Sequence, residues 1–406
     1  MDWLKDKMMR ADRLLFYACL GAFFAMPIGT APMTFFGILA AVVWLFSGKV
    51  FSRRHIYIQH SWCWPVILLI ILPWAGLLYS PDTTGLGLEY AQKTHYWIYG
   101  FAVAAIAFKR FQGKHLVQAF LVGLALISVA SIIQVGVILM QGGVLGNDFG
   151  LGPSYSTMSA YLVLGIMVTA FYFKEIKDSR KRVYMCLLMG LFFIHLIMLK
   201  GRNGYFTFIV VSPLIIVQMV KRLNLIKVLL VYGLIASLMA LSPSVRDQAS
   251  WTVRQINEQI NAPPDTAWGK GFTANEYRFL LFRNALRVFK QHPLFGVGTG
   301  GFQTVVKQNG KPDWPLLAHP HNNFLQMAVS FGLIGVLALT WLFWELFKNS
   351  WSQRKTVTGY FVFSSTIVIF VSGMFNSQIL DTGTAVLLAL TVGLQEEFPR
   401  FSNSIR

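Results

Sequence analysis

Charged residues are scarce in this chain, and acidic residues are the scarcest of all. Only 13% of the 406 residues are charged, with 17 acidic residues against 35 basic ones, whereas 55% are hydrophobic. The mean hydropathy of +0.54 is too high for a soluble globular protein of this length. The composition therefore excludes a soluble domain and predicts a protein with several membrane spans.

Motifs that commonly hold metals or nucleotides are also missing. The sequence contains no HExxH motif, no acidic pair at metal-ligand spacing, no DxD-like site and no P-loop. The glycine-rich stretch 296–301 does not follow a strand of a βαβ unit, so it is not a dinucleotide fingerprint. Cys19, Cys63 and Cys186 lie in apolar segments and form neither a disulfide set nor a metal set. We therefore expect a function that needs no metal and no cofactor.

Long apolar runs are abundant, and each is close to the roughly 20 residues that cross a bilayer. Lipid offers no hydrogen-bond partners to the backbone, so runs this apolar must be helices. The first run has no small-residue cleavage site, so no signal peptide is expected. The sequence predicts an all-α polytopic membrane protein with about 12 transmembrane helices. The predicted spans are 14–30, 32–48, 62–80, 95–108, 115–141, 154–173, 183–200, 203–220, 225–242, 320–347, 357–376 and 382–396.

Basic residues are concentrated on one side of these spans. If the N-terminus lies inside, 23 of the 35 Lys and Arg residues fall in inner segments and 3 in short outer loops. This asymmetry follows the positive-inside rule and predicts that both termini are cytoplasmic. The net charge of +18 is thereby explained without a nucleic-acid partner.

One extramembrane segment is much longer than the others and divides the chain into three parts. Residues 1–242 are predicted to hold nine spans, 243–318 a large helical periplasmic loop, and 319–406 three spans and a cytoplasmic tail. Within the loop, Pro263 and Pro264 break the chain, and residues 274–291 are predicted to form a helix ending at His292-Pro293.

This loop helix carries four basic residues, which divide between two faces. At about 100° per residue, Arg283, Arg287 and Lys290 share a polar face, whereas Arg278 lies on the apolar face with Phe282. The polar face is expected to be solvated or to contact lipid headgroups. A guanidinium on a packed face needs an anionic partner, so Arg278 is a candidate phosphate ligand.

A second unusual cation, Arg202, lies in a glycine-flanked turn between two spans. Short outer loops otherwise hold almost no positive charge. An arginine at the membrane interface can bind a pyrophosphate with two parallel hydrogen bonds. An ordinary turn cation is the alternative interpretation of Arg202.

A lone histidine, His321, opens the span that follows the long loop. An imidazole with an ordinary pKa of about 6.5 is suited to accept a hydroxyl proton at neutral pH. His319 is a possible substitute, although the intervening proline is expected to point the two rings in different directions. Ala328, Gly332 and Gly335 fall on or near the His321 face of the predicted helix, so that face can pack tightly against another helix or line a crevice. A purely structural role, such as helix capping, is the alternative for a lone histidine.

The outer acids are few and isolated. Asp148 and Asp381 could orient a substrate hydroxyl or a histidine, although solvation in a loop is the simpler expectation for both.

The motif around His321 resembles that of the bacterial O-antigen ligases. His321-Asn322, nine residues and then Gly332-Leu333-Ile334-Gly335 is similar to the family pattern H-[NSQ]-x9-G-x-x-G. The Arg278 segment, followed by Phe289, Pro293 and the Gly296–Gly298 turn, is similar to the family's R…F…P…GxG pattern. Arg202 matches an arginine that the family carries after its seventh span. The same superfamily contains O-antigen polymerases and protein O-oligosaccharyltransferases.

The resemblance implies a GT-C-like glycosyltransferase of the bacterial inner membrane with a periplasmic active site. The donor would be O-antigen on undecaprenyl pyrophosphate, and the acceptor would be a sugar hydroxyl of lipid A–core. The resemblance makes His321 the general base and Arg202 and Arg278 the pyrophosphate ligands, with no metal and inversion at the anomeric carbon. His319, Asn322 and Asp381 are secondary candidates.

Three alternatives remain open from the sequence. An O-antigen polymerase would extend the donor glycan, and a protein O-oligosaccharyltransferase would use a protein acceptor. A transporter of lipid-linked sugars would instead place its polar groups near the midplane in broken helices. The unusual polar residues of this chain cluster at the outer face, which disfavours a transporter.

Overall fold

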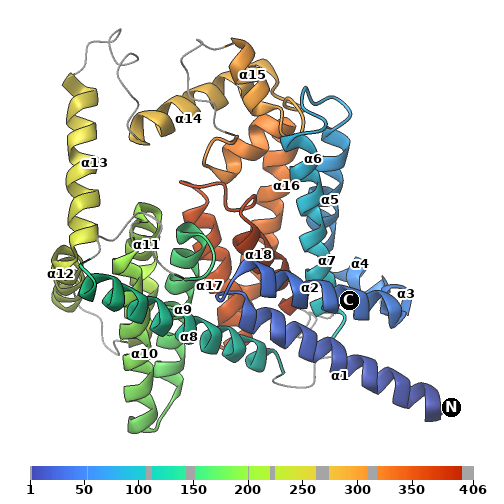
Figure 1. Ribbon diagram of the computed structural model, residues 1–406. Helices are drawn as coiled ribbons and strands as arrows, with labels where there is room; N and C mark the ends of the chain where they lie inside the picture. The colour runs from blue at the N-terminus through green and yellow to red at the C-terminus, as the bar shows by residue number, and fades with distance from the viewer. Residues whose placement is uncertain are drawn as a thin grey trace.

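The computed structural model of the protein describes residues 2–52, 54–106, 112–142, 151–199, 201–219, 225–261, 274–309 and 318–395. All regular secondary structure in these ranges is helical (Figure 1). The prediction of an all-α protein is therefore confirmed for this part of the chain.

A helix overlaps each of the twelve predicted spans. The bounds differ most at α1, which begins at Asp2 and ends at Ala25 instead of spanning 14–30; α7 is shorter than its predicted span, and α8 and α16 are longer. The twelve helices are α1 (Asp2–Ala25), α2 (Thr30–Phe46), α5 (Cys63–Gly76), α7 (Tyr96–Ala104), α8 (Gln112–Met140), α9 (Tyr155–Glu175), α10 (Ser179–Met198), α11 (Arg202–Met219), α12 (Leu225–Leu241), α16 (Asn323–Gln353), α17 (Val357–Ser372) and α18 (Thr382–Leu394). Short helices between them are α3 (Lys49–Ser52), α4 (Arg54–Gln59), α6 (Leu86–Gln92) and the 3₁₀ turn η1 (Lys93–His95).

Length and apolar composition identify fewer complete spans than twelve. Among the described residues, α8, α9, α10 and α16 are each long and apolar enough to cross a membrane alone. A fifth span is possible if the bent pair 30–46 and 49–59 counts as one. The fold is thus that of a membrane protein, while the number of twelve spans and their orientation stay predictions.

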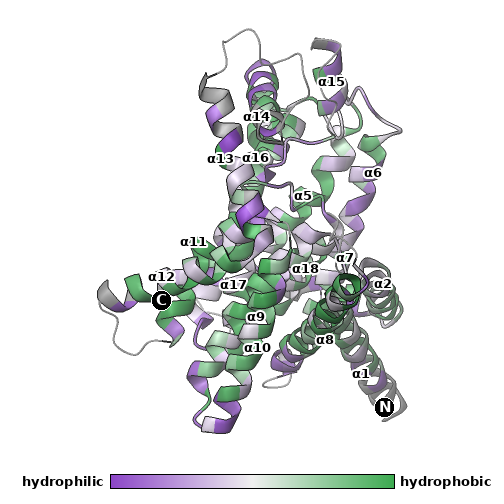
Figure 2. Cartoon of the chain, turned by 60° about the vertical axis from the view of Figure 1, so that its left-hand side comes forward, coloured by the Kyte–Doolittle hydropathy of each residue, from purple (hydrophilic) through white to green (hydrophobic). Residues whose placement is uncertain are grey.

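Three helices form the interior of the bundle. Nearly all of α9 is buried, together with most of α17 and α18. Peripheral helices instead expose apolar side chains along their outer faces, and on α8 these include Val122, Leu126, Val129 and Ile133. Figure 2 shows α8 and α11 as mainly hydrophobic. Such exposed apolar faces are expected where helices contact lipid.

Three further helices lie between α12 and α16, within the predicted periplasmic loop. They are α13 (Pro243–Asn261), α14 (Ala274–Gln291) and α15 (Phe302–Asn309). The bounds of α14 are those predicted from the sequence. Its two faces are also confirmed, because Leu281 and Ala285 are buried whereas Arg283 and Lys290 are exposed. Pro263 and Pro264 lie outside the described residues.

Helix α16 is broken, which corrects the expectation of a continuous helix below His321. Gly332 has φ 62° and ψ −148°, a backbone conformation open essentially only to glycine. The break redirects the helix after Gly332, so Gly335 does not continue the face formed by the residues before the break, as it would on a straight helix. The sequence signal for a break was present in the glycine itself, but a lone glycine is also tolerated inside regular helices.

The stretch 293–298, directly after α14, fills this break. The amides of Val297 and Gly298 donate to the carbonyls of Val329 and Ser330 at 2.8 and 3.0 Å. In return, the amide of Leu333 donates to the carbonyl of Pro293 at 2.8 Å. These bonds satisfy backbone groups that a broken helix would leave unpaired. The glycine-rich turn therefore docks the end of α14 onto α16.

The same turn is also fixed to the end of α5. The Thr299 hydroxyl donates to the carbonyl of Pro73 at 2.6 Å, and the Ser80 hydroxyl donates to the carbonyl of Thr299 at 2.7 Å. The turn after α14 is consequently held by hydrogen bonds to α16 and to α5 with the residues that follow it, two segments that are distant in sequence.

Replacing Gly332 by alanine should destabilise the protein. The alanine would have to adopt a disfavoured backbone conformation, and its Cβ would overlap the backbone of Leu294. We expect a loss of about 1–3 kcal/mol of unfolding free energy, seen as a lower melting temperature of the purified protein by tryptophan fluorescence. Gly136→Ala in α8 is the matched control, since nothing lies near its added Cβ and alanine favours a helix. Equal melting temperatures for the two variants would show that the break is not a structural requirement.

Candidate active site

The backbone at His321 has an unusual conformation that follows from its position between two elements. Residues 318–322 connect the loop to α16, and Asn322 caps that helix by accepting a hydrogen bond from the amide of Leu325 at 2.9 Å. His321 has φ 52° and is the only described non-glycine residue with a positive φ. A sparsely populated conformation of this kind persists where the surroundings fix it, often at a functional site.

A side-chain hydrogen bond fixes the tautomer of His321. Its Nδ1 lies 3.1 Å from Oδ1 of Asn376, while Nδ2 of Asn376 donates to the Ser156 hydroxyl at 2.7 Å. Since the amide oxygen can only accept, the proton of the neutral ring resides on Nδ1. Nε2 is therefore left with the free electron pair that a general base requires.

Asn376 is itself held between three helices. It lies in the turn between α17 and α18, and Ser156, its partner, belongs to the first turn of α9. Gln378 donates to the same Ser156 hydroxyl at 3.2 Å. Asn322 donates to the carbonyl of Met374 at 2.8 Å, which ties the start of α16 to this turn. The imidazole of His321 is thus positioned by a polar network.

His319 contacts His321, contrary to the expectation that the two rings point apart. The ring centroids are 4.4 Å apart with an angle of 69° between the planes. The left-handed backbone of His321 turns its side chain back toward His319, which the proline between them does not prevent. Burial, the neighbouring His321 and Lys93 together lower the pKa of His319 to about 4. His319 is therefore a weak base at neutral pH.

Arg202 and Arg278 come together although they are far apart in sequence. Arg202 is the first residue of α11 and Arg278 lies in the first half of α14. Burial and the charge of Arg278 lower the pKa of Arg202, and burial also lowers the pKa of Arg278. The Tyr155 hydroxyl lies near both guanidinium groups, where its charge would raise both pKa values.

The two arginines differ in their contacts with the protein. Arg202 donates to the Thr252 hydroxyl at 3.1 Å and lies over the ring of Trp251, both on α13. Arg278 forms neither a hydrogen bond nor an ion pair with the described residues. Two partly buried like charges repel each other, and an anion placed between them would relieve that repulsion.

The histidine and the arginines form one site. Burial lowers the pKa of His321 most, the Asn376 hydrogen bond opposes this shift, and the charge of Arg278 lowers the pKa further. The effect of Arg278 on both His321 and Arg202 means that it lies near both of them. Helices α11 and α14 and the start of α16 thereby gather the three principal residues that the sequence singled out.

The two acidic residues that were predicted to lie in outer loops are Asp381 and Asp148. Asp381 caps α18 by accepting from the amide of Gly383, and it also accepts from the hydroxyls of Ser154 and Thr157 at the start of α9. Its carboxylate therefore joins two helix N-termini and is occupied by these bonds. Asp148 lies outside the described residues.

Sequence reasoning missed Asn376, Ser156 and Tyr155. The signal for the first was the polar run Asn376-Ser377-Gln378 between two apolar helices, which is unusual in a short turn of a membrane protein. Ser156 and Tyr155 carry no distinguishing pattern, because they belong to an ordinary helix start. Only the packing of α9 beside the turn between α17 and α18 brings them to the site.

The chain was also compared with known families. The O-antigen ligase family model matches residues 187–340, a segment that includes Arg202, Arg278, His319, His321 and Asn322. The match confirms the resemblance to this family for that segment. Among curated proteins, none has a significant match to the chain.

The charge of Arg278 should be measurable in the titration of His321. Wild-type His321 should titrate below the ordinary value near 6.5, because burial and Arg278 both disfavour its charged form. Arg278→Gln removes the positive charge and should raise that pKa. The measurement is NMR titration of histidine-labelled protein, with His321→Gln used to assign the signal. Arg283→Gln, on the exposed face of the same helix, should leave the pKa unchanged, and an equal shift in both variants would contradict the proposed proximity.

Proposed function

We propose that the protein is an O-antigen ligase that transfers O-antigen glycan from undecaprenyl pyrophosphate to a sugar hydroxyl of lipid A–core at the periplasmic face of the inner membrane. The observation that carries this proposal is the meeting of two guanidinium groups and a histidine of fixed tautomer at one place. A diphosphate needs guanidinium groups as ligands, and an attacking hydroxyl needs a histidine as its base. The family match to O-antigen ligase supports the same class of reaction.

The reaction requires one proton transfer and one displacement. Nε2 of His321 accepts the proton of the acceptor hydroxyl as its oxygen attacks the anomeric carbon of the donor. The bond between that carbon and the pyrophosphate oxygen breaks, and the leaving pyrophosphate takes the electron pair. A single displacement inverts the anomeric centre. His321 afterwards returns its proton to solvent or to the departing pyrophosphate.

Arg202 and Arg278 stabilise the charge that develops on the leaving group. Guanidinium groups in a partly buried site act more strongly than in water and need no reorganisation during the reaction. The two guanidinium groups repel each other, so binding of the anionic donor between them also relieves an unfavourable interaction. The proposal includes no metal and no cofactor.

A transporter of lipid-linked sugars accounts for the site less well. A broken helix is a feature of many transporters, where unwound backbone binds ions near the midplane. Here the break in α16 is occupied by backbone hydrogen bonds from residues 293–298. The remaining alternatives are enzymes of the same superfamily and differ from the proposal in the acceptor.

A deletion strain complemented with variants separates these enzymes. Loss of a ligase should leave bare lipid A–core and accumulate lipid-linked O-antigen, whereas loss of a polymerase should leave core with one repeat unit. Complementation by wild type should restore ligation, and His321→Ala should not, since a general base contributes about 10²–10⁴-fold. His319→Ala should lose less. Core lipopolysaccharide analysed on gels, with protein amounts checked by immunoblot, gives the measurement, and single-repeat core would contradict the ligase assignment.

Substitutions at Arg202 and Arg278 should show whether ligation requires only a positive charge or also the planar geometry of a guanidinium group. Arg278→Ala and Arg202→Ala should each abolish most ligation, and Lys at either position should restore only part of it, because an ammonium cannot bind two oxygens in parallel. Initial rates with purified protein and lipid-linked donor test this. Arg283→Ala and Lys290→Ala, on the exposed face of α14, are the matched controls and should be milder. Full activity of Arg278→Ala would remove the electrostatic part of the mechanism.

A further inference from the structure

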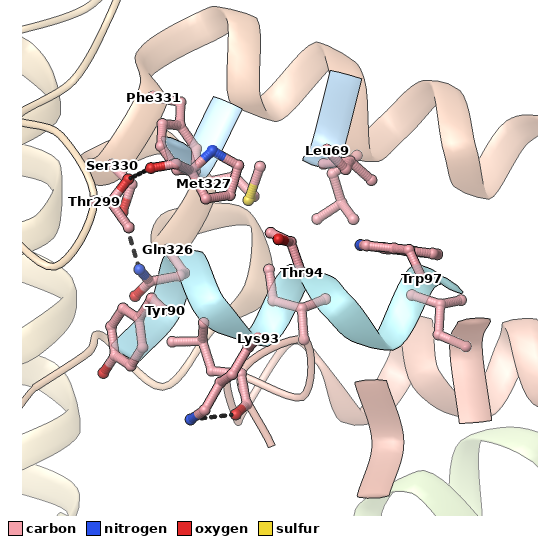
Figure 3. A pocket seen from close by; sticks show the side chains of 15 residues that line it. Leu69, Tyr90, Lys93, Thr94, Trp97, Thr299, Gln326, Met327, Ser330 and Phe331 are labelled. Atoms are coloured by element: carbon pink, nitrogen blue, oxygen red, sulfur yellow. Dashed lines mark hydrogen bonds between the residues drawn. The ribbon is translucent and has the colours of Figure 1, made fainter. Parts of the chain in front are cut away.

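A pocket lies beside the histidine pair and contains none of the residues assigned above. Its walls are α5, the stretch from α6 to α7, the first half of α16 and the turn before α18 (Figure 3). Apolar and aromatic side chains, among them Trp97 and Leu388, form most of the lining. Its cavity volume is about 80 Å³, and the wider space that extends through its open mouth is about 620 Å³. Pockets of this kind, with few polar groups in an apolar lining, are typical of small-molecule sites.

The pocket contains a buried side-chain amide, that of Gln326, whose oxygen has no hydrogen-bond donor among the described residues. The Gln326 side chain is 3% exposed, and its Nε2 donates to the Ser330 hydroxyl at 2.9 Å. Its Oε1 accepts no hydrogen bond from the described residues. A buried acceptor without a partner is unfavourable by about 1–3 kcal/mol. Figure 3 shows the amide of Gln326 directed toward the side of the pocket formed by Tyr90 and Lys93, where a ligand hydroxyl could donate to it.

A lysine supplies positive charge at the edge of the pocket. Nζ of Lys93 donates to the carbonyl of Leu380 at 3.1 Å and lies 2.9 Å from the carboxylate of Glu89. Lys93 is 24% exposed, and Glu89 is more exposed at 55%. The lysine is thereby held at the pocket, where it could also contact an anionic group of a ligand.

The pocket lies near the histidines. Leu380, in the pocket wall, follows Asn376, the hydrogen-bond partner of His321, by four residues, and Gln326 lies in the first turn of α16, which begins directly after Asn322. In a direct displacement, the attacking oxygen and the leaving oxygen lie on opposite sides of the anomeric carbon. If the arginines bind the donor diphosphate, the acceptor needs a binding place of its own beside the histidine, and the pocket with Lys93 offers one.

We propose that this pocket binds the acceptor, with Gln326 Oε1 accepting a hydrogen bond from an acceptor hydroxyl and Lys93 binding an acceptor phosphate. The chemical class is a phosphorylated, hydroxylated sugar attached to a lipid, whose apolar part contacts the Trp97 and Leu388 side of the pocket. This assignment rests on the proposed ligase function and identifies the residues that select its second substrate.

Steady-state kinetics with two acceptors tests the proposal. The probes are lipid A–core with its phosphates intact and the same preparation after chemical dephosphorylation, each at saturating lipid-linked donor. Lys93→Gln should raise the KM for the intact acceptor about tenfold, the loss of one charge-assisted hydrogen bond. The KM for the dephosphorylated acceptor, the donor KM and kcat should not change. Gln326→Leu should raise the KM for both acceptors.

Two controls keep the outcomes distinct. Ser330→Ala removes the hydrogen bond that Gln326 donates to Ser330 but keeps the Gln326 side-chain amide. It therefore separates an effect of altered packing on the KM from an effect of lost acceptor recognition. Lys290→Gln removes one exposed charge at a distance from the pocket and should leave every KM unchanged. If the variants ligate with unchanged acceptor KM, or if only the donor KM rises, the pocket is not the acceptor site although the ligase function stands. If wild-type protein transfers glycan to neither acceptor, the ligase function fails and this assignment fails with it.

Discussion

The position of Arg278 relative to His321 depends on the break in α16. The helix stops hydrogen bonding to itself at Gly332, and the stretch 293–298 provides the missing partners. Because this stretch follows α14 without a gap, the same bonds hold α14 and its arginine against the helix that begins beside His321. The glycines in this region are therefore structural parts of the site, although none of them touches the proposed substrates. A segment attached in this way can hold a charged side chain in place as firmly as a packed helix does.

The scarcity of acidic residues and the arginine pair are connected. In most proteins a partly buried arginine has a carboxylate partner. Here the chain has only 17 acidic residues, and Asp381, at the first turns of α9 and α18, is occupied as a helix cap. The repulsion between Arg202 and Arg278 is therefore not neutralised by Asp381, and a substrate anion can be the partner. Burial and, to a smaller extent, the charge of Arg278 also lower the pKa of His321 and so favour its neutral form.

Polar residues at helix ends both terminate helices and organise the site. Asn322 caps α16 and bonds to the turn after α17, while Asp381 caps α18 and bonds to the start of α9. Asn376 uses its two amide atoms to join His321 to Ser156. Inside a membrane bundle, helix ends on one side are the natural place for such groups, because their free backbone amides need partners and water is nearby. The pocket beside Lys93 lies at the same end.

The sequence by itself determined that the apolar runs are helices and where α14 begins and ends, and it singled out Arg202, Arg278 and His321 as candidates, because apolar period and isolated charge are local properties. It could not determine the break in α16, since a glycine in an apolar run is compatible with a straight helix as well. It also could not identify Asn376 or Ser156, whose roles depend on turns that are about 220 residues apart in the chain. The contact between His319 and His321 was predicted wrongly because it follows from a left-handed backbone that neighbouring helices impose. Tertiary structure alone decided which helix ends meet, because that depends on packing among α9, α11, α14 and α16 and on hydrogen bonds that no single segment contains.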